Sequence, residues 1–179
     1  DGEPSVSTVQ VTEAFSVSTW THVAVVMTAS SPGSTTGDVA IYMDGVLLKI
    51  VASQQLPLAV LRSGYYVGKS HWSADPMFEG EMRDLMLWDA ALSTEQLDFV
   101  RLGNQMPAGV AAPVIEMMRS SCDVVSPAAP PSPASPPPAC TVEGAFTFTG
   151  AADSYREATP RTPTIGATDL TLSVWVKRT

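Results

Sequence analysis

The stretch Met77–Leu97, MFEGEMRDLMLWDAALSTEQL, decides the fold, because a long strand pattern runs directly into a short helix pattern within it. Over residues 78–88 apolar side chains alternate with polar ones, which is typical of a half-buried β-strand. The alternation changes phase between Met82 and Leu85, as it does when one residue is inserted into a strand. We therefore expect a β-bulge near Arg83–Asp84.

The end of the same stretch predicts a helix over about 94–102. Ser93 can cap the first turn, and Gln96 stands three residues further on to complete a capping box. Gly103 follows the last helical residues, where a glycine commonly ends a helix. The sequence therefore predicts one short helix directly after the long strand.

The residues on either side of this stretch predict strands. Residues 5–15 and 20–27 are rich in β-branched and aromatic side chains, which favours two strands. Asp44-Gly45 lies between the apolar runs 39–43 and 46–50, and Asp-Gly suits the two positive φ angles of a type I′ hairpin turn. We expect Trp20, Trp88 and Trp175 to lie in the core, from their positions in the strand pattern. Further strands are expected at residues 65–68, 113–118, 145–148 and 170–176.

Composition and charge exclude two classes of function. Ten basic against 18 acidic residues give a net charge of -8, whereas binding to nucleic acid requires clustered positive charge. No window approaches 18 uninterrupted apolar residues, so we expect no membrane span in this chain. A hydrophobic content of 45% is ordinary for a globular protein and is enough to build a core.

A proline-rich segment divides the chain. Seven prolines lie within Pro127–Pro138, between the only two cysteines, Cys122 and Cys140. This composition predicts an extended polyproline II spacer. A disulfide is the preferred state of the cysteines and implies an oxidising compartment, whether Cys122 pairs with Cys140 or each pairs elsewhere. The expected divisions of the chain are 1–121, 122–140 and 141–179.

Five pieces of the chain resemble the laminin-G-like and pentraxin family of concanavalin A-like jelly rolls. Met77–Leu97 is similar to the family's closing strand and helix, and Trp20–Val25, Ile41–Val46 and Tyr66–Gly68 are similar to its inner strands and turns. Residues 146–177 resemble the opening elements of the same fold. The resemblance implies an all-β, antiparallel jelly-roll β-sandwich with one short helix, plus the polyproline II segment.

The order of these pieces is reversed relative to the family, whose members begin with the Phe-Thr-Gly element and end with the helix. Two architectures follow. In one, the chain is part of a tandem array of sandwiches. Residues 1–121 are then the C-terminal portion of one sandwich, 122–140 are the linker, and 141–179 are the N-terminal portion of the next sandwich. In the other, 141–179 folds back and supplies the missing strands to 1–121, or does so for a neighbouring copy. An unpaired sheet edge would favour such donation.

The resemblance suggests two kinds of ligand. Calcium binding through Asp75 and Glu79 is weakly indicated, since the pentraxin-like Glu-Gln-Asp run is absent and Lys69 lies close by in the sequence; we expect no other cofactor. Trp72 and Tyr65 are candidates for stacking on a sugar ring, although packing of Trp72 over the sandwich edge is the favoured interpretation. No pair of carboxylates has the spacing of jelly-roll glycosidases, so we expect no enzymatic activity and no catalytic residue.

The proline-rich segment also resembles the hydroxyproline-rich segments of green-algal and plant wall glycoproteins. Together these features predict a structural extracellular glycoprotein that builds a fibre or matrix from laminin-G-like sandwiches, located at a cell surface, at a flagellar surface, or in a cell wall or matrix. Its expected partners are copies of itself or neighbouring repeats. The alternative is a carbohydrate-binding, lectin-like module. Candidate positions for hydroxylation and O-glycans are Pro127, Pro130, Pro131, Pro133, Pro136, Pro137, Pro138, Ser132 and Ser135.

Overall fold

A computed structural model describes residues 8–12, 15–58, 60–61, 65–70, 72, 74–103, 109–117, 145–149, 156–158, 164–165 and 169–179. Both cysteines and the proline-rich segment lie outside the described residues, so the disulfide and glycan expectations concern positions that the structure does not describe. Within the described part, no helix is long and apolar enough to cross a membrane.

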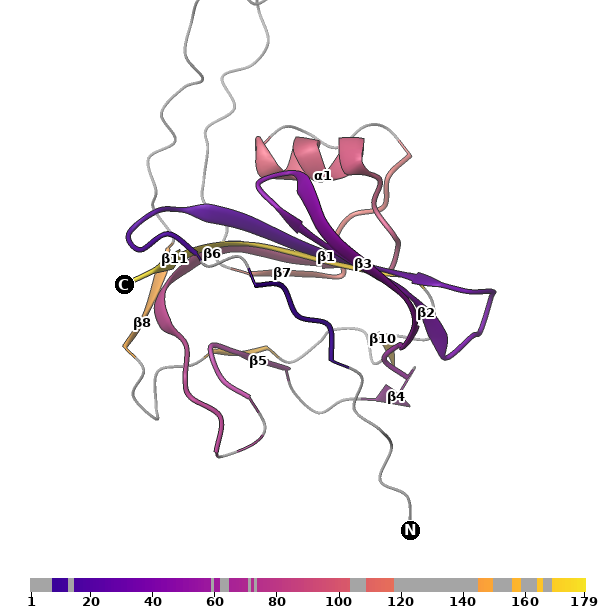
Figure 1. Ribbon diagram of the computed structural model, residues 1–179, viewed down its shortest axis with the longest axis horizontal. Coiled ribbons are helices and arrows are strands. Elements are labelled where there is room, and N and C mark those ends of the chain that lie inside the picture. The colour runs from indigo at the N-terminus through magenta and orange to yellow at the C-terminus, as the bar shows by residue number, and fades with distance from the viewer. Residues whose placement is uncertain are drawn as a thin grey trace, which may run out of the picture.

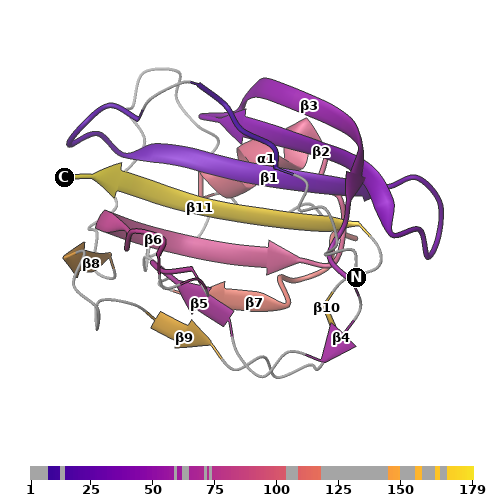
Figure 2. The same ribbon diagram turned by 60° about the horizontal axis from the view of Figure 1, so that its bottom comes forward.

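The described residues form a large antiparallel sheet, flanked by one helix and two small sheets. The large sheet has seven strands in the order β3-β2-β1-β11-β6-β7, and β8 pairs with β6 as well (Figure 2). Its strands are β1 (Thr21–Ala29), β2 (Thr36–Met43), β3 (Val46–Gln55), β6 (Glu79–Trp88), β7 (Ile115–Met117), β8 (Phe146–Thr149) and β11 (Leu170–Arg178). The small sheets pair β4 (Val60–Leu61) with β10 (Thr164–Ile165), and β5 (Tyr65–Val67) with β9 (Arg156–Ala158).

The large sheet is covered on both faces. Helix α1 (Thr94–Arg101) lies on one face and the small sheets lie on the other (Figure 1). Under α1, the buried residues Ala24, Val26, Ala40, Trp88, Leu92 and Leu97 form one core cluster. Two further clusters gather around Phe148 with Val67, and around Leu87 with Leu170. This mostly antiparallel β architecture with one short helix agrees with the expected jelly-roll sandwich.

The local features predicted from the stretch Met77–Leu97 are confirmed. Two β6 residues lie opposite one β11 residue between the pairs Trp175↔Arg83 and Ser173↔Met86, and Asp84 has a φ of 51°. This is the expected β-bulge. The Ser93 side chain accepts a hydrogen bond from the Gln96 backbone N–H, and the Gln96 side chain accepts one from the Ser93 backbone N–H. The capping box therefore begins α1 as predicted.

The hairpin between β2 and β3 is also confirmed. Asp44 and Gly45 have φ angles of 50° and 85°, as a type I′ turn requires, and Met43 lies opposite Val46. Two irregularities in register, between Gly37 and Val39 and between Ile41 and Tyr42, interrupt the ladder further along.

The carboxy-terminal strands pair with strands from the first part of the chain. β11 lies between β1 and β6 and is antiparallel to both, as Figure 2 shows. β8 pairs with β6, β9 with β5, and β10 with β4. In the described part of the chain, no two of these four strands pair with each other. The described strands of the carboxy-terminal part are therefore paired with strands of the first part of the chain and not with each other.

Two expectations are wrong. Residues 8–12 and Phe15, within the expected strand 5–15, form no ladder; the Gln10 carbonyl instead accepts a hydrogen bond from Lys49 Nζ at 2.7 Å. Trp88 is buried, but Trp20 and Trp175 are only half-buried, and the Arg83 guanidinium carbon lies 4.6 Å and 5.2 Å from their ring centroids.

Candidate functional site

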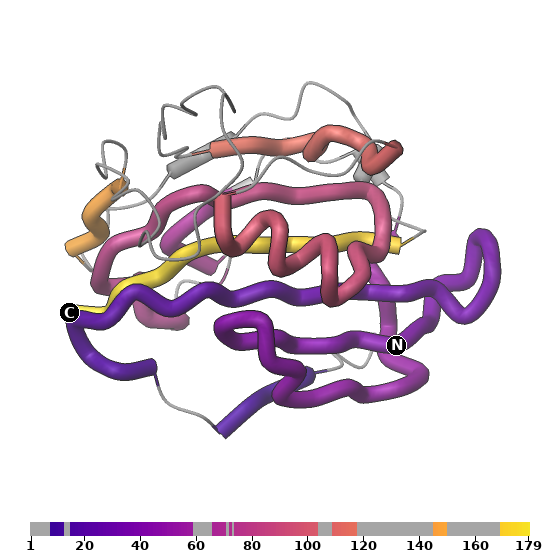
Figure 3. The backbone as a smooth tube through the Cα atoms, turned by 90° about the horizontal axis from the view of Figure 1, so that it is seen from above, coloured from indigo at the N-terminus to yellow at the C-terminus, as the bar shows by residue number. Residues whose placement is uncertain are grey.

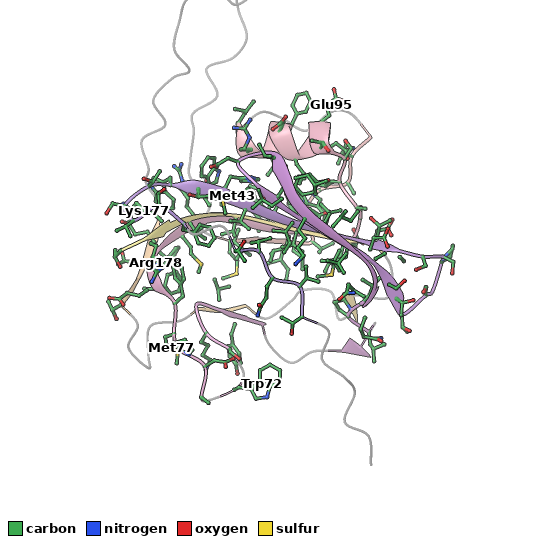
Figure 4. The ribbon with its side chains drawn as sticks, in the orientation of Figure 1. Met43, Trp72, Met77, Glu95, Lys177 and Arg178 are labelled. Carbon is green, nitrogen blue, oxygen red and sulfur yellow. The ribbon has the colours of Figure 1, made fainter. Side chains whose placement is uncertain are left out.

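The connection between β5 and β6 forms a closed loop, residues 68–78. The Phe78 backbone N–H donates to the Gly68 carbonyl at 2.8 Å and holds the two ends together. Within the loop, the Trp72 N–H donates to Ser70 Oγ and the Asp75 N–H donates to the Trp72 carbonyl. Trp72 is 68% exposed. It lies on the opposite side of the molecule from Glu95 of α1 (Figure 4).

An open cleft of about 650 Å³ lies between the ends of this loop and the end of β11. Its floor is apolar and soft, because phenylalanine and methionine side chains supply it. The cleft is also lined by charged residues: two cations, Lys69 and Arg178, and one carboxylate, Glu79. The lining residues are Gly68, Lys69, Pro76, Met77, Phe78, Glu79, Met82, Arg178 and Thr179.

Gly80 allows β11 to close this cleft. Arg178 lies opposite Gly80 across the β11–β6 ladder, and Gly80 has a φ of 146°. A Cβ atom at Gly80 would lie 2.3 Å from the Lys177 carbonyl oxygen, closer than any real contact of this kind. Strand alternation then separates the two basic residues at the end of β11: Arg178 lines the cleft, while Lys177 forms an ion pair with Glu81. Figure 4 shows the two residues on either side of the strand.

Lys69 is held at the cleft by an aromatic ring. Its Nζ lies 4.1 Å from the centroid of the Tyr66 ring, a cation–π contact. The cleft thus combines an apolar floor with positive charge, although the chain as a whole has a net charge of -8.

A second cluster of aromatic and charged side chains lies on the helix side of the large sheet. The Arg83 guanidinium carbon is 4.6 Å from the Trp20 ring centroid and 5.2 Å from that of Trp175. Lys177 Nζ lies 5.2 Å from the Trp20 ring. No local pattern in the sequence predicts this stack, because Arg83 meets Trp175 only through the pairing of β6 with β11.

His22 and Ser173 form a buried pair beside this stack. His22 Nε2 lies 2.8 Å from Ser173 Oγ, and each residue is only 1% exposed. Burial lowers the His22 pKa to about 4, assisted by the positive charge of Arg101 and opposed by Asp44, Asp98 and Asp84. A hydrogen bond between a serine and a neutral histidine also occurs between a catalytic nucleophile and its general base. Here, however, neither side chain is accessible to a substrate. The pair therefore joins β1 to β11.

The structure places the predicted site residues as follows. Trp72 does not pack over the sandwich edge, since most of its surface is exposed, so the favoured interpretation is wrong. Tyr65 begins β5, but its side chain lies outside the described part. Asp75 is exposed and Glu79 lines the cleft. Among the described residues, no three His, Cys, Asp or Glu side chains are grouped as they would be to hold a metal ion.

Lys69, Phe78 and Arg178 were not predicted to be neighbours from the sequence. Lys69 and Phe78 follow from the closed loop, but Arg178 reaches them only because β11 pairs with β6. A basic residue at the end of a strongly alternating strand is the one signal for it in the sequence.

Comparison with known proteins gives one match. A family model described as the concanavalin A-like lectin/glucanases superfamily matches residues 1–98. No curated protein and no solved structure matches the chain.

Proposed function

Because the chain belongs to the concanavalin A-like lectin/glucanase superfamily, we propose that it is a non-enzymatic extracellular module that binds a saccharide through the loop that carries Trp72 and the cleft at the ends of this loop. The observation that carries this proposal is Trp72, a large aromatic side chain left 68% exposed on the loop that also forms the cleft. Exposed aromatic side chains next to concave surfaces are typical of binding sites.

The charges of the cleft favour a saccharide that carries carboxylate or sulfate groups. Lys69 and Arg178 outnumber the single carboxylate among the described lining residues, Glu79. Arg178 can hold a planar anion through two parallel hydrogen bonds, whereas Lys69 supplies a point charge. Binding of such a ligand should weaken as the salt concentration rises.

The same lining supports a non-enzymatic role. Glycoside hydrolysis ordinarily uses two carboxyl groups that flank the scissile bond. Glu79 is the one acidic residue among the described residues of the cleft, and Glu81, two residues further along β6, forms an ion pair with Lys177. We expect binding without release of reducing sugar.

Replacing Trp72 should weaken saccharide binding with little effect on folding. We expect Trp72→Ala to reduce affinity for an acidic polysaccharide at least about tenfold, or ~1.4 kcal/mol, because the stacking surface is lost. Arg178→Gln should weaken binding to the acidic ligand and have less effect on a neutral glucan. Titrations of a panel of neutral, uronate-containing and sulfated glycans, followed by tryptophan fluorescence and calorimetry, measure both effects.

Two substitutions elsewhere provide matched controls. Leu102→Ala removes an apolar side chain that is 60% exposed beside α1, and Lys49→Gln removes a cation on β3. Both should leave binding unchanged. The proposal fails if no glycan of the panel binds, if Leu102→Ala weakens binding as much as Trp72→Ala, or if binding is accompanied by steady release of reducing sugar.

A second function is favoured by the sequence around the prolines. We propose that modules of this kind are joined by O-glycosylated, hydroxylated proline-rich segments into a fibre or matrix at the cell surface. Seven prolines within 127–138, bracketed by Cys122 and Cys140, support this proposal. Electron micrographs of the native particle should show regularly spaced beads, and isolated single modules would contradict it.

A further inference from the structure

The residues that line the cleft differ in exposure as well as in chemistry. Met77, Phe78 and Met82 are apolar and half-buried, whereas Glu79 and Arg178 are charged and exposed. A ligand that fills the cleft therefore meets apolar side chains on its inner side and charged side chains closer to the solvent.

The apolar lining is the outer side of a core cluster. Phe78 and Met82 pack against the buried residues Val67 and Phe148. The Phe78 ring meets the Phe148 ring edge to face, with the ring centroids 5.8 Å apart and the ring planes at 75°. Met82 also lies opposite Phe146 in the β6–β8 ladder. These contacts hold the apolar surface in place before a ligand binds, so that little ordering is needed on binding.

This apolar surface gives a hydroxyl group little to bind. Methionine sulfur is a weak hydrogen-bond acceptor, and a phenylalanine side chain has no polar atom. The backbone N–H of Phe78 already donates to the Gly68 carbonyl at 2.8 Å. A hydroxyl group placed against these side chains would lose its water without gaining an equal partner, which weakens binding. A methyl group in the same place is stabilised by leaving water.

The two cations of the cleft are also held in place. Arg178 lies opposite Gly80 in the β11–β6 ladder, and its carbonyl accepts a hydrogen bond from the Ser18 N–H at 2.8 Å. The Lys69 ammonium lies 4.1 Å from the centroid of the Tyr66 ring. The cleft volume of about 650 Å³ is within the range of small-molecule sites, so one ligand can reach both the cations and the apolar lining.

We propose that the saccharide recognised by this cleft carries a methyl group as well as an anionic group, as a sulfated 6-deoxyhexose does. The methyl group covers Met77, Phe78 and Met82, and the anionic group lies at Lys69 and Arg178. The inference rests on the proposed saccharide-binding function. It narrows the ligand from acidic saccharides in general to acidic saccharides with an apolar substituent.

Two sugars that differ by a single oxygen atom test the proposal. L-Fucose 4-sulfate has a methyl group at C5, where L-galactose 4-sulfate has a hydroxymethyl group. Glycopolymers that display one or the other sugar at the same density are titrated against the full chain. We expect the chain to prefer the fucose polymer about tenfold, since one small group in an apolar site discriminates by roughly 10- to 200-fold and this cleft is open.

Substitutions in the apolar lining should remove this preference. Glutamine has nearly the shape of methionine but is polar, so Met77→Gln should reduce the preference to about twofold or less, whereas Met77→Leu should retain it. Met82→Gln is a second variant with the same expected result. The matched control is Met43→Gln, which changes a half-buried methionine of β2 that lies away from Met77 and Trp72 (Figure 4).

Arg178→Gln separates recognition of the anion from recognition of the methyl group. It should weaken binding of both sulfated polymers by the same factor and leave the ratio of their affinities unchanged. Raising the salt concentration should act in the same way, because salt screens the charges and not the apolar contact.

The outcomes separate this inference from the function on which it rests. The inference is supported if the preference is lost in Met77→Gln or Met82→Gln, in protein that keeps the wild-type thermal transition, and is kept in Met43→Gln. Equal binding of the two sulfated polymers to the wild type, or a preference unchanged in both lining variants, overturns it while saccharide binding stands. If no glycan binds at all, the proposed function and this inference fail together.

Discussion

At the scale of single residues, His22 shows how a buried polar group ties two distant segments together. Its ring shares a hydrogen bond with Ser173 and makes an edge contact with Trp175, while its backbone N–H donates to Asp44 Oδ1. The ring is neutral at pH 7 because burial lowers its pKa to about 4. Protonation would therefore place a charge between β1 and β11 without adequate solvation.

This burial predicts a loss of stability in acid. The folded pKa of about 4 lies below the ordinary value of 6.5, so the unfolded chain binds the proton more readily. The stabilising effect is complete above pH 6.5 and is lost as the pH falls from 6.5 through 4; its full size is on the order of 3 kcal/mol. Chemical denaturation at pH 7.5, 6, 5 and 4.5 measures it.

The comparison variant is His22→Gln, which has no titrating ring. It should be less stable than the wild type at pH 7.5, but its stability should decline less between pH 6.5 and 4.5. Carboxylates titrate equally in both proteins, so the difference between the two curves isolates His22. Parallel curves would show that the histidine is protonated in the folded state or is solvated there.

At the scale of elements, the β2–β3 hairpin is fixed both by its own turn and by α1. Gly45 has a φ of 85°, and a Cβ atom there would lie 2.7 Å from Asp98 Oδ1 and 3.1 Å from Arg101 Nε. Asp98 and Arg101 also pair with each other on the helix at 3.1 Å. The turn therefore needs glycine for two reasons: its backbone conformation and its contact with the helix.

Comparing two glycines separates these reasons. We expect Gly45→Ala to destabilise the protein by more than the roughly 1 kcal/mol that the left-handed backbone conformation costs an alanine. Gly33 has a similar φ of 79°, but nothing lies within 4 Å of a Cβ placed there, so Gly33→Ala should show the conformational cost alone. Urea unfolding gives both values. If the two substitutions reduced the free energy of unfolding equally, α1 would have moved to accommodate the new methyl group at no cost.

At the scale of the whole molecule, α1 and the long strands form one layered body. Seen from above, α1 lies over the sheet where β1 and β11 run side by side (Figure 3). The core clusters on the two faces share strand β6: Trp88 belongs to the cluster under α1, whereas the next residue back, Leu87, belongs to a cluster on the other face. Packing on one face is therefore transmitted to the other through the same backbone.

This arrangement predicts a single unfolding transition that includes the carboxy-terminal segment. Phe148→Ala, which empties a site that is 2% exposed, should destabilise the whole protein by about 3–5 kcal/mol. The change should appear identically in tryptophan fluorescence and in far-ultraviolet circular dichroism. Val46→Ala, at an exposed position on β3, should have little effect. Two separate transitions in Phe148→Ala would indicate that residues 145–179 belong to an independent unit.

Local patterns in the sequence were sufficient to predict several individual turns, bulges and helix ends. The hairpin at Asp44-Gly45, the bulge at Asp84 and the capping box at Ser93 depend on residues within a few positions of each other, so they could be predicted from the sequence. The strand expected at residues 5–15 was wrong because alternation alone does not provide a neighbouring strand edge. The family's sandwich was also predictable, since its motifs are local.

Tertiary structure alone decided where those elements meet. The sequence left open whether residues 141–179 fold back or open another domain, because strand pairing over more than a hundred residues depends on the free energy of the assembled sheet. The insertion of β11 between β1 and β6 brings Arg178 to Lys69 and Phe78, places Arg83 between Trp20 and Trp175, and pairs His22 with Ser173. Each of these contacts joins residues from different segments of the chain, so no pattern within a single segment predicts it.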